Sequence, residues 1–201
     1  EGCDVNVTPG VYVIDTPLII PDGATIRSAG ARFIRKCQMG ANAIQNRMFQ
    51  PLGSFTLDGI NCETEGQNFY MHSDPFVTGN ITIKNCTFKY GNLWHASFSN
   101  MLVEDCQFFR SGTGWCPPNS VYRNNEFYGP TKKGQHSFFS VWGLVLGVGN
   151  RFYETNRGPV LQTGPVTGSL ILDNYMRNVR GGEGNAGELI LLEGQKPING
   201  N

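Results

Sequence analysis

Short runs of alternating hydrophobic and polar residues, each followed by a turn residue and then an aromatic, recur along most of the chain. The clearest copy is Ile81-Thr82-Ile83-Lys84-Asn85-Cys86-Thr87-Phe88, and a second copy runs from Met101 to Phe108. Other copies begin at Phe55, Val121, Leu146 and Leu170. Alternation with a period of two indicates a half-buried strand, and no window keeps the i, i+3, i+4, i+7 spacing of a helix. The pattern predicts short strands throughout.

The residue at the turn sets the period of the repeat. Successive copies carry, at intervals of 19 to 25 residues, Cys62, Cys86, Cys106, Asn125, Asn150 and Asn174. Self-similarity at such a period is typical of solenoids, in which each repeat forms one coil and pairs with the next through parallel strands. We therefore expect an all-β parallel β-helix of about seven or eight coils, each of roughly 20–25 residues.

The start of the chain supports this interpretation. Two segments, Val5 to Ile14 and Pro17 to Ile26, read as strand, Pro-Gly-x-Tyr, strand, Pro, turn and strand. Together with the repeat, this resembles the pectin-lyase-like right-handed parallel β-helix superfamily, and among its members the β-helix domains of phage tailspikes and tail fibres are closest in character. The resemblance covers nearly the whole chain and implies a right-handed coil. Leucine-rich repeats lack support because Leu does not recur at fixed positions, while a β-sandwich stays open as the structural alternative.

We expect one β-helix domain over residues 1–194, in which residues 1–50 supply N-terminal capping strands and the first coils. Residues 195–201 have no strand pattern and read as a tail or linker. The chain starts at Glu1, with neither a basic and apolar leader nor an apolar run of about 18 residues. It therefore reads as a mature or excised fragment without a membrane segment.

Composition narrows the choice of ligand. The chain has 16 basic and 16 acidic residues and no net charge. Charged residues make up 16% of it, where roughly 25% is usual. A nucleic acid or an anionic membrane would call for a basic face, so neither is expected as a partner. An uncharged polar surface suits hydroxyl-rich ligands, and it is also what a turn-rich β protein presents.

Equivalent residues of successive coils should stack in columns about 4.8 Å apart. One column, expected to fill the interior, consists of Phe88, Phe108, Phe127, Phe152 and Met176. The turn column of Cys and Asn is expected at a bend, where Asn side chains satisfy backbone groups. Cys86 and Cys106 would lie close enough for a disulfide, but buried thiols are the favoured interpretation.

A third column contains all three histidines of the chain, at intervals of 20 to 23 residues: His72, His95, Cys116 and His136. Alternation would turn these side chains and Asp74 outward. The column is interpreted as a polar stack that closes the third sheet, as a ligand-contact strip, or, in its sharpest form, as a transition-metal site. For the ligand strip we predict His72, His95 and Asp74 as catalytic groups. The predicted sugar contacts are Trp94, Trp115, His136 and Arg157. No metal and no cofactor are predicted.

The resemblance implies a function in polysaccharide recognition at an extracellular or virion surface, in a tailspike or fibre with or without depolymerase activity. A cell-surface glycan is the expected partner, and a homotrimer is one option for assembly. A microbial polysaccharide lyase or glycoside hydrolase is the enzymatic alternative, and an adhesin shaft without activity is the structural one. The chain lacks the Asn-Thr-Asp, Asp-Asp, Gly-His-Gly and Arg-x-Lys motifs of polygalacturonases and the acidic calcium cluster of pectate lyases. These departures disfavour the enzymatic alternative.

Overall fold

The computed structural model describes residues 2–36, 47–64, 69–72, 78–94, 99–114, 119–129, 145–155, 160–162, 170–178 and 191–193. These residues form strands and turns and contain no helix. Every pairing between the described strands is parallel. The protein is thus an all-β parallel β-helix, as the repeat predicts, and the sandwich alternative is wrong.

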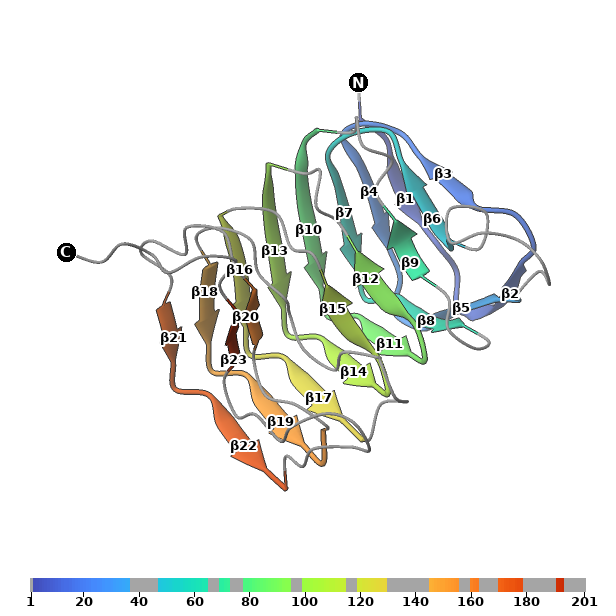
Figure 1. Ribbon diagram of the computed structural model, residues 1–201. Helices are drawn as coiled ribbons and strands as arrows, with labels where there is room; N and C mark the ends of the chain where they lie inside the picture. Colours follow the sequence, from blue (N-terminus) through green and yellow to red (C-terminus); the bar gives the residue numbers. More distant parts are fainter. Residues whose placement is uncertain are drawn as a thin grey trace.

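Three sheets carry the stacked coils (Figure 1). Sheet A consists of β1 (Asp4–Asn6), β4 (Ala24–Arg27), β7 (Phe55–Asp58), β10 (Asn80–Lys84), β13 (Asn100–Glu104), β16 (Ser120–Arg123), β18 (Val145–Val148) and β21 (Leu170–Leu172). Sheet B consists of β2 (Gly10–Ile14), β5 (Ala31–Arg35), β8 (Asn61–Thr64), β11 (Thr87–Lys89), β14 (Gln107–Phe109), β17 (Glu126–Tyr128), β19 (Arg151–Tyr153) and β22 (Tyr175–Arg177). Sheet C consists of β3 (Leu18–Ile20), β6 (Phe49–Pro51), β9 (Phe69–His72), β12 (Asn92–Trp94) and β15 (Gly112–Gly114). A separate pair is formed by β20 (Val160–Gln162) and β23 (Leu191–Glu193).

Each coil runs through a strand of sheet A, then sheet B and, in five described coils, sheet C. Sheets A and B each contain eight described strands, which agrees with the predicted seven or eight coils. In Figure 1 the strands of these two sheets follow the chain from one end of the stack to the other. The predicted boundary between the domain and the tail, at residues 194 and 195, lies outside the described residues.

Alternation within each strand decides which side chains enter the core. In β10, Ile81 and Ile83 are buried, whereas Thr82 and Lys84 lie on the outer face. Fully burying an aliphatic side chain of this size stabilises the fold by about 1.5–3 kcal/mol. Because the pattern repeats in the sheet A strands from β4 to β16, the interior becomes a continuous apolar core.

The predicted aromatic column is confirmed. Neighbouring ring centroids are 5.2 Å apart for Phe88 and Phe108, 4.7 Å for Phe108 and Phe127, and 4.8 Å for Phe127 and Phe152. The rings lie within 17° of parallel, and all four side chains are fully buried. Stacked aromatic pairs contribute about 0.5–1.5 kcal/mol beyond their buried area. This column therefore stabilises the packing of each coil against the next.

The placement of Cys62 in the turn column is wrong. Cys62 pairs with Phe88 on one side and with Phe33 on the other, so it belongs to the aromatic column. The residue that precedes β8 as Cys86 precedes β11 is Ile60, because Asn61 pairs with Thr87. The interval from Ile60 to Cys86 is longer than the next one, from Cys86 to Cys106. Cys62, two residues after Ile60, therefore lies closer to the spacing expected of the repeat.

The remaining turn column forms a hydrogen-bonded ladder of asparagines. The Asn125 side-chain amide donates to the backbone oxygen of Val103 and to Oδ1 of Asn150, each at 3.0 Å. Asn150 repeats the arrangement one coil later, donating to Asn174 Oδ1 at 3.0 Å. The ladder satisfies backbone groups that the bend would otherwise bury without partners, each of which would cost about 1–3 kcal/mol. It continues as Cys106 and Cys86, whose thiols are buried and form no disulfide.

The turn between sheets A and B is the same in every described coil from β7 onward. Its first residue has a left-handed backbone, with φ between 51° and 73°, at Gly59, Asn85, Asp105, Asn124, Gly149 and Asp173. Gly, Asn and Asp reach this region at lower cost than other residues. A second left-handed position follows sheet B, at Tyr90, Arg110, Gly129, Glu154 and Asn178.

Candidate functional site

Most of the predicted site residues lie outside the described residues. These are Asp74, His95, Trp115, His136 and Arg157, and Cys116 of the histidine column also lies outside. His72 and Trp94 are the last residues of β9 and β12 in sheet C. Strand pairing brings His72 and Trp94 together. The roles of the seven predicted site residues, which do not include Cys116, stay predictions.

The alignment of His72 with His95 is wrong by one residue. The Cα partner of His72 is Trp94, and Trp94 in turn pairs with Gly114. The register shifts at the start of the pair, where Asn92 lies opposite Phe69 but the next residue lies opposite Met71. A β-bulge of this kind places two residues against one, so a spacing counted along the sequence fails beyond it.

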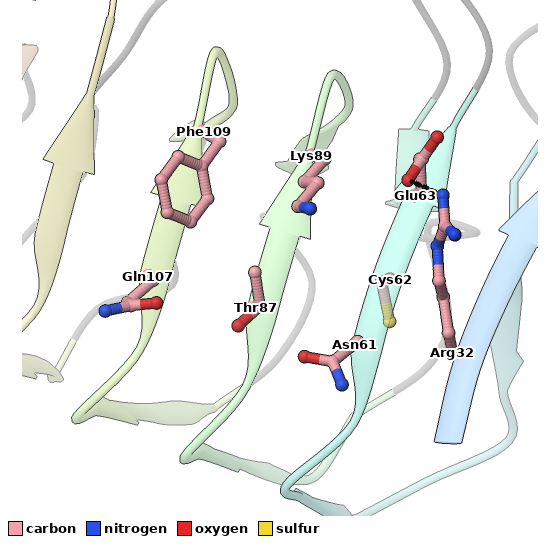
Figure 2. Close-up of a pocket in the computed structure, with 8 residues that line it drawn as sticks. All are labelled: Arg32, Asn61, Cys62, Glu63, Thr87, Lys89, Gln107 and Phe109. Atoms are coloured by element: carbon pink, nitrogen blue, oxygen red, sulfur yellow. Dashed lines mark hydrogen bonds and ion pairs between the residues drawn. The ribbon is translucent and has the colours of Figure 1, made fainter. Parts of the chain in front are cut away.

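A groove of about 510 Å³ lies on the outer face of sheet B (Figure 2). Eight residues line it: Arg32, Asn61, Cys62, Glu63, Thr87, Lys89, Gln107 and Phe109. They come from four successive coils, on β5, β8, β11 and β14. The long direction of the lining therefore crosses the strands and follows the stack of coils.

Strand pairing arranges these side chains in two rows. Asn61, Thr87 and Gln107 are partners in one row. Glu63, Lys89 and Phe109 are partners in the other row, as Figure 2 shows. Between the rows run the inward-facing positions of the buried aromatic column, including Cys62. Short side chains at Asn61 and Thr87, flanked by long ones, explain why the surface is hollowed here.

The ends of the groove differ in chemistry. At one end Arg32 Nη2 contacts Glu63 Oε2 at 2.6 Å, which joins β5 to β8. At the other end the ammonium of Lys89 lies 5.8 Å from the centre of the Phe109 ring. Such a cation over an aromatic face contributes about 0.5–1 kcal/mol at an exposed site. The lining thus offers amide and hydroxyl groups at its middle and an aromatic ring with a cation at one end.

Aromatic side chains continue the outer face of sheet B beyond the groove. The rings of Phe109 and Tyr128 are 4.9 Å apart and those of Tyr128 and Tyr153 are 5.1 Å apart, stacked in both cases. Tyr175 follows at 6.0 Å from Tyr153 in a tilted arrangement, with 52% of it exposed. Sheet B thus has an aromatic column on each face, one buried and one at the surface.

Glu126 is held in place beside this surface column. Its Oε2 accepts hydrogen bonds from the Tyr128 hydroxyl at 2.6 Å and from Gln107 Nε2 at 3.1 Å. The hydrogen bond to the carboxylate favours the protonated phenol and raises the pKa of Tyr128 to about 12. The phenol therefore stays neutral at physiological pH and acts as a hydrogen-bonding group, not as a base.

The carboxylates on the outer face of sheet A likewise form hydrogen bonds and ion pairs with residues of neighbouring coils. Asp58 accepts a hydrogen bond from Asn85 at 2.8 Å and lies 3.4 Å from the Lys84 ammonium. Glu104 accepts a hydrogen bond from Arg123 at 2.6 Å. These contacts tie one coil to the next, and exposed pairs of this kind each contribute about 0.2–1 kcal/mol.

The buried thiols are poor nucleophiles. Desolvation, followed by the neighbouring Cys86, raises the pKa of both Cys62 and Cys106 well above the usual value. Because the thiolate is the reactive form, neither sulfur is set up for covalent chemistry. Within the part of the chain that the structure describes, no group of three or more His, Cys, Asp or Glu side chains could hold a metal ion.

None of the predicted site residues lines the groove. A usable signal exists, because the positions immediately before and after each buried aromatic must point outward. Reading those positions down the coils would have placed Thr87, Lys89, Gln107 and Phe109 on one surface.

Comparison of the chain with protein-family models, with curated proteins and with solved structures finds no match. Among the described residues there is no helix long and apolar enough to span a membrane.

Proposed function

We propose that the protein binds a polysaccharide along the outer face of sheet B. The observation that carries this proposal is the 510 Å³ groove, in which an aromatic ring adjoins a row of amide and hydroxyl side chains. Ligand sites commonly combine apolar or aromatic walls with a few well-placed polar groups. A sugar presents the matching surfaces, since its C–H faces pack on rings and its hydroxyls exchange hydrogen bonds with amides.

The shape of the groove favours a chain-like ligand. Its lining spans four coils stacked at the usual strand spacing of about 4.8 Å. On β8, β11 and β14, the same two outward positions of each strand line the groove. A polymer lying along the stack would meet a new pair of outward side chains at each coil. Affinity should therefore rise with the length of the oligosaccharide until the ligand spans the lining from Arg32 to Phe109.

Binding, and not hydrolysis, is the activity that this groove supports. Glycoside hydrolysis generally needs two carboxyl groups about 5–9.5 Å apart. The lining contains one carboxylate, Glu63, and its contact with Arg32 is 2.6 Å long. We propose that the chain is a glycan-recognising β-helix at an extracellular or virion surface, and we assign any catalysis to the predicted histidine column.

The test uses a variant that fills the groove and leaves the core side chains unchanged. Thr87→Arg adds a long side chain to the lining, whereas Thr82→Arg makes the same change in the same coil on the outer face of sheet A. On a glycan array followed by calorimetry with any hit, Thr87→Arg should weaken binding at least tenfold, about 1.4 kcal/mol. Thr82→Arg should leave binding unchanged, and both variants should melt like the parent protein.

Two results would contradict the proposal. The first is a protein that binds no glycan on the array. The second is a hit whose affinity survives Thr87→Arg but falls in Trp94→Ala or His72→Ala variants that remain folded. That pattern would place the site at the predicted sheet C column instead.

A further inference from the structure

The first coil exposes apolar side chains on its outer face. Val11 and Val13 of β2 are 63% and 51% exposed, and Ile19 of β3 is 62% exposed. In the next coil, the residue that pairs with Val11 is Arg32, and the residue that pairs with Ile19 is Gln50. At these two positions the outer face therefore changes from apolar to polar after a single coil.

A core position at this end of the stack is exposed as well. Val5 of β1 pairs with Ile26, and Ile26 pairs with Leu57, which is fully buried. Val5 thus belongs to an inward-facing row, yet 44% of it is exposed. Apolar surface of this kind is stabilised when another molecule covers the end of the stack.

Strand β2 is an edge strand without the usual protection against pairing. Among the described strands its partner is β5 alone, and it lies at one end of the stack in Figure 1. It has five residues and contains neither a charge nor a proline. Edge strands are usually short or charged, because their open N–H and C=O groups pair readily with another chain. The opposite edge of sheet B, β22, has three residues and carries Arg177.

The sequence of β2 is complementary to a second copy of itself. In an antiparallel pair centred on Tyr12, Val11 of each copy lies opposite Val13 of the other copy. Both of these pairs project from the outer face, where opposed apolar side chains stabilise an antiparallel sheet. Because β2 contains no charged residue, the pair brings no like charges together.

We propose that two copies of this chain join end to end at their first coils, by antiparallel pairing of β2 in one copy with β2 in the other. A two-fold axis at Tyr12 relates the copies, so the interface is isologous. Sheet B then continues through both molecules, and the end of each copy covers Val5 of the other. The lining of the groove begins at Arg32 on β5. The joint therefore leaves the groove accessible and does not depend on the glycan binding proposed above.

Single cysteines test the register of the joint in a Cys3→Ser background, which removes an exposed thiol. An equimolar mixture of Val11→Cys and Val13→Cys chains, treated with oxidised glutathione, should form a disulfide-linked dimer. Directly opposite residues have Cα atoms about 4.5–5.5 Å apart, which is within the range for a disulfide. Each variant alone should form several-fold less, because its own thiols do not lie opposite each other.

A charge introduced into β2 tests the affinity of the joint. Val13→Lys should weaken self-association about tenfold in sedimentation equilibrium, because the ammonium lies opposite an apolar residue of the other copy. Leu170→Lys is the matched control, since Leu170 is a 46% exposed aliphatic residue at the other end of the stack. It should leave the equilibrium between monomer and dimer unchanged, and both variants should melt like the parent protein.

Three results would overturn the joint. The first is a protein that stays monomeric up to about 1 mM. The second is a dimer that survives Val13→Lys, or that Leu170→Lys weakens equally, because the interface then lies elsewhere. The third is equal crosslinking of the mixture and of the separate variants, which rules out the register centred on Tyr12. None of these measurements involves a glycan, so their failure is distinct from failure of the proposed function.

Discussion

Asparagine serves the turn column better than cysteine because its side chain is both donor and acceptor. Asn125 uses both capacities: Oδ1 accepts from the Cys106 backbone amide at 3.0 Å, and Nδ2 donates to Val103 and Asn150. Cys106 stands at the next rung, and its sulfur lies 3.7 Å from the backbone oxygen of Ile83, the counterpart of Val103 one coil earlier. The site is thus shaped for an amide.

Cys106→Asn should therefore extend the ladder by one rung and stabilise the protein by about 1 kcal/mol, the net value of a typical hydrogen bond. Urea unfolding of the variant and the parent measures the difference. Cys62→Asn is the contrasting substitution, because its partners across the sheet are Phe33 and Phe88. An amide buried there should cost about 1–3 kcal/mol. Equal effects from the two substitutions would refute a ladder at the Cys106 position.

The sequence predicted the turn column correctly from Cys86 to Asn174. Asn125, Asn150 and Asn174 follow one another in register and were aligned correctly. Cys62 was misplaced in the turn column because it lies near the expected interval before Cys86. The residue that occupies the turn position in this coil, Ile60, lies two residues earlier. Chemical identity is a weak guide in such a coil, whereas the pairing of Phe55 with Ile81 settles the register.

At the scale of the strand and its turn, the recurring constraint is the left-handed residue. Two such positions flank each sheet B strand from β11 to β22. A residue with a Cβ loses about 1–2 kcal/mol there, and the cost is greatest for bulky side chains. Tyr90, with φ of 71° and 42% exposed, is the least suited of the residues found at these positions.

Tyr90→Gly should stabilise the protein by about 0.5–1 kcal/mol, since relief of backbone strain exceeds the added entropy of the unfolded chain. Tyr175→Gly makes the same change on an exposed tyrosine within a strand and should destabilise by a similar amount. Gly59→Ala should destabilise more, because its Cβ would lie 2.1 Å from the backbone oxygen of Ser28. Thermal unfolding of the three variants provides the comparison, and a loss of stability in Tyr90→Gly would show that the ring matters more than its backbone.

Strands and turns were predictable from the sequence because each coil repeats the same buried and exposed positions. The candidate site was not, because outward positions carry no repeated identity. In one outward row, Glu63, Lys89 and Phe109 share no chemistry, although they are adjacent in space. The β-bulge in β9 adds a second obstacle, since it shifts His72 from the register that its spacing to His95 suggests.

At the scale of the whole molecule, stability should follow nearest-neighbour rules. Each described coil pairs only with the coil before it and the coil after it in sheets A and B. The stability of such a stack is approximately the sum of the intrinsic terms of its coils and the terms of their interfaces. A destabilising substitution in one coil should therefore lower the stability of the adjacent coils most and that of distant coils least.

Phe108→Ala tests this at a central coil. The ring is fully buried between Phe88 at 5.2 Å and Phe127 at 4.7 Å, so its removal should cost about 3–5 kcal/mol. Hydrogen exchange with mass spectrometry should show the greatest loss of protection in β11, β14 and β17, and a smaller loss in β2 and β5. A uniform loss across all sheet B strands would instead mean that the molecule unfolds as a single cooperative unit, because local opening then gives way to global unfolding in every coil.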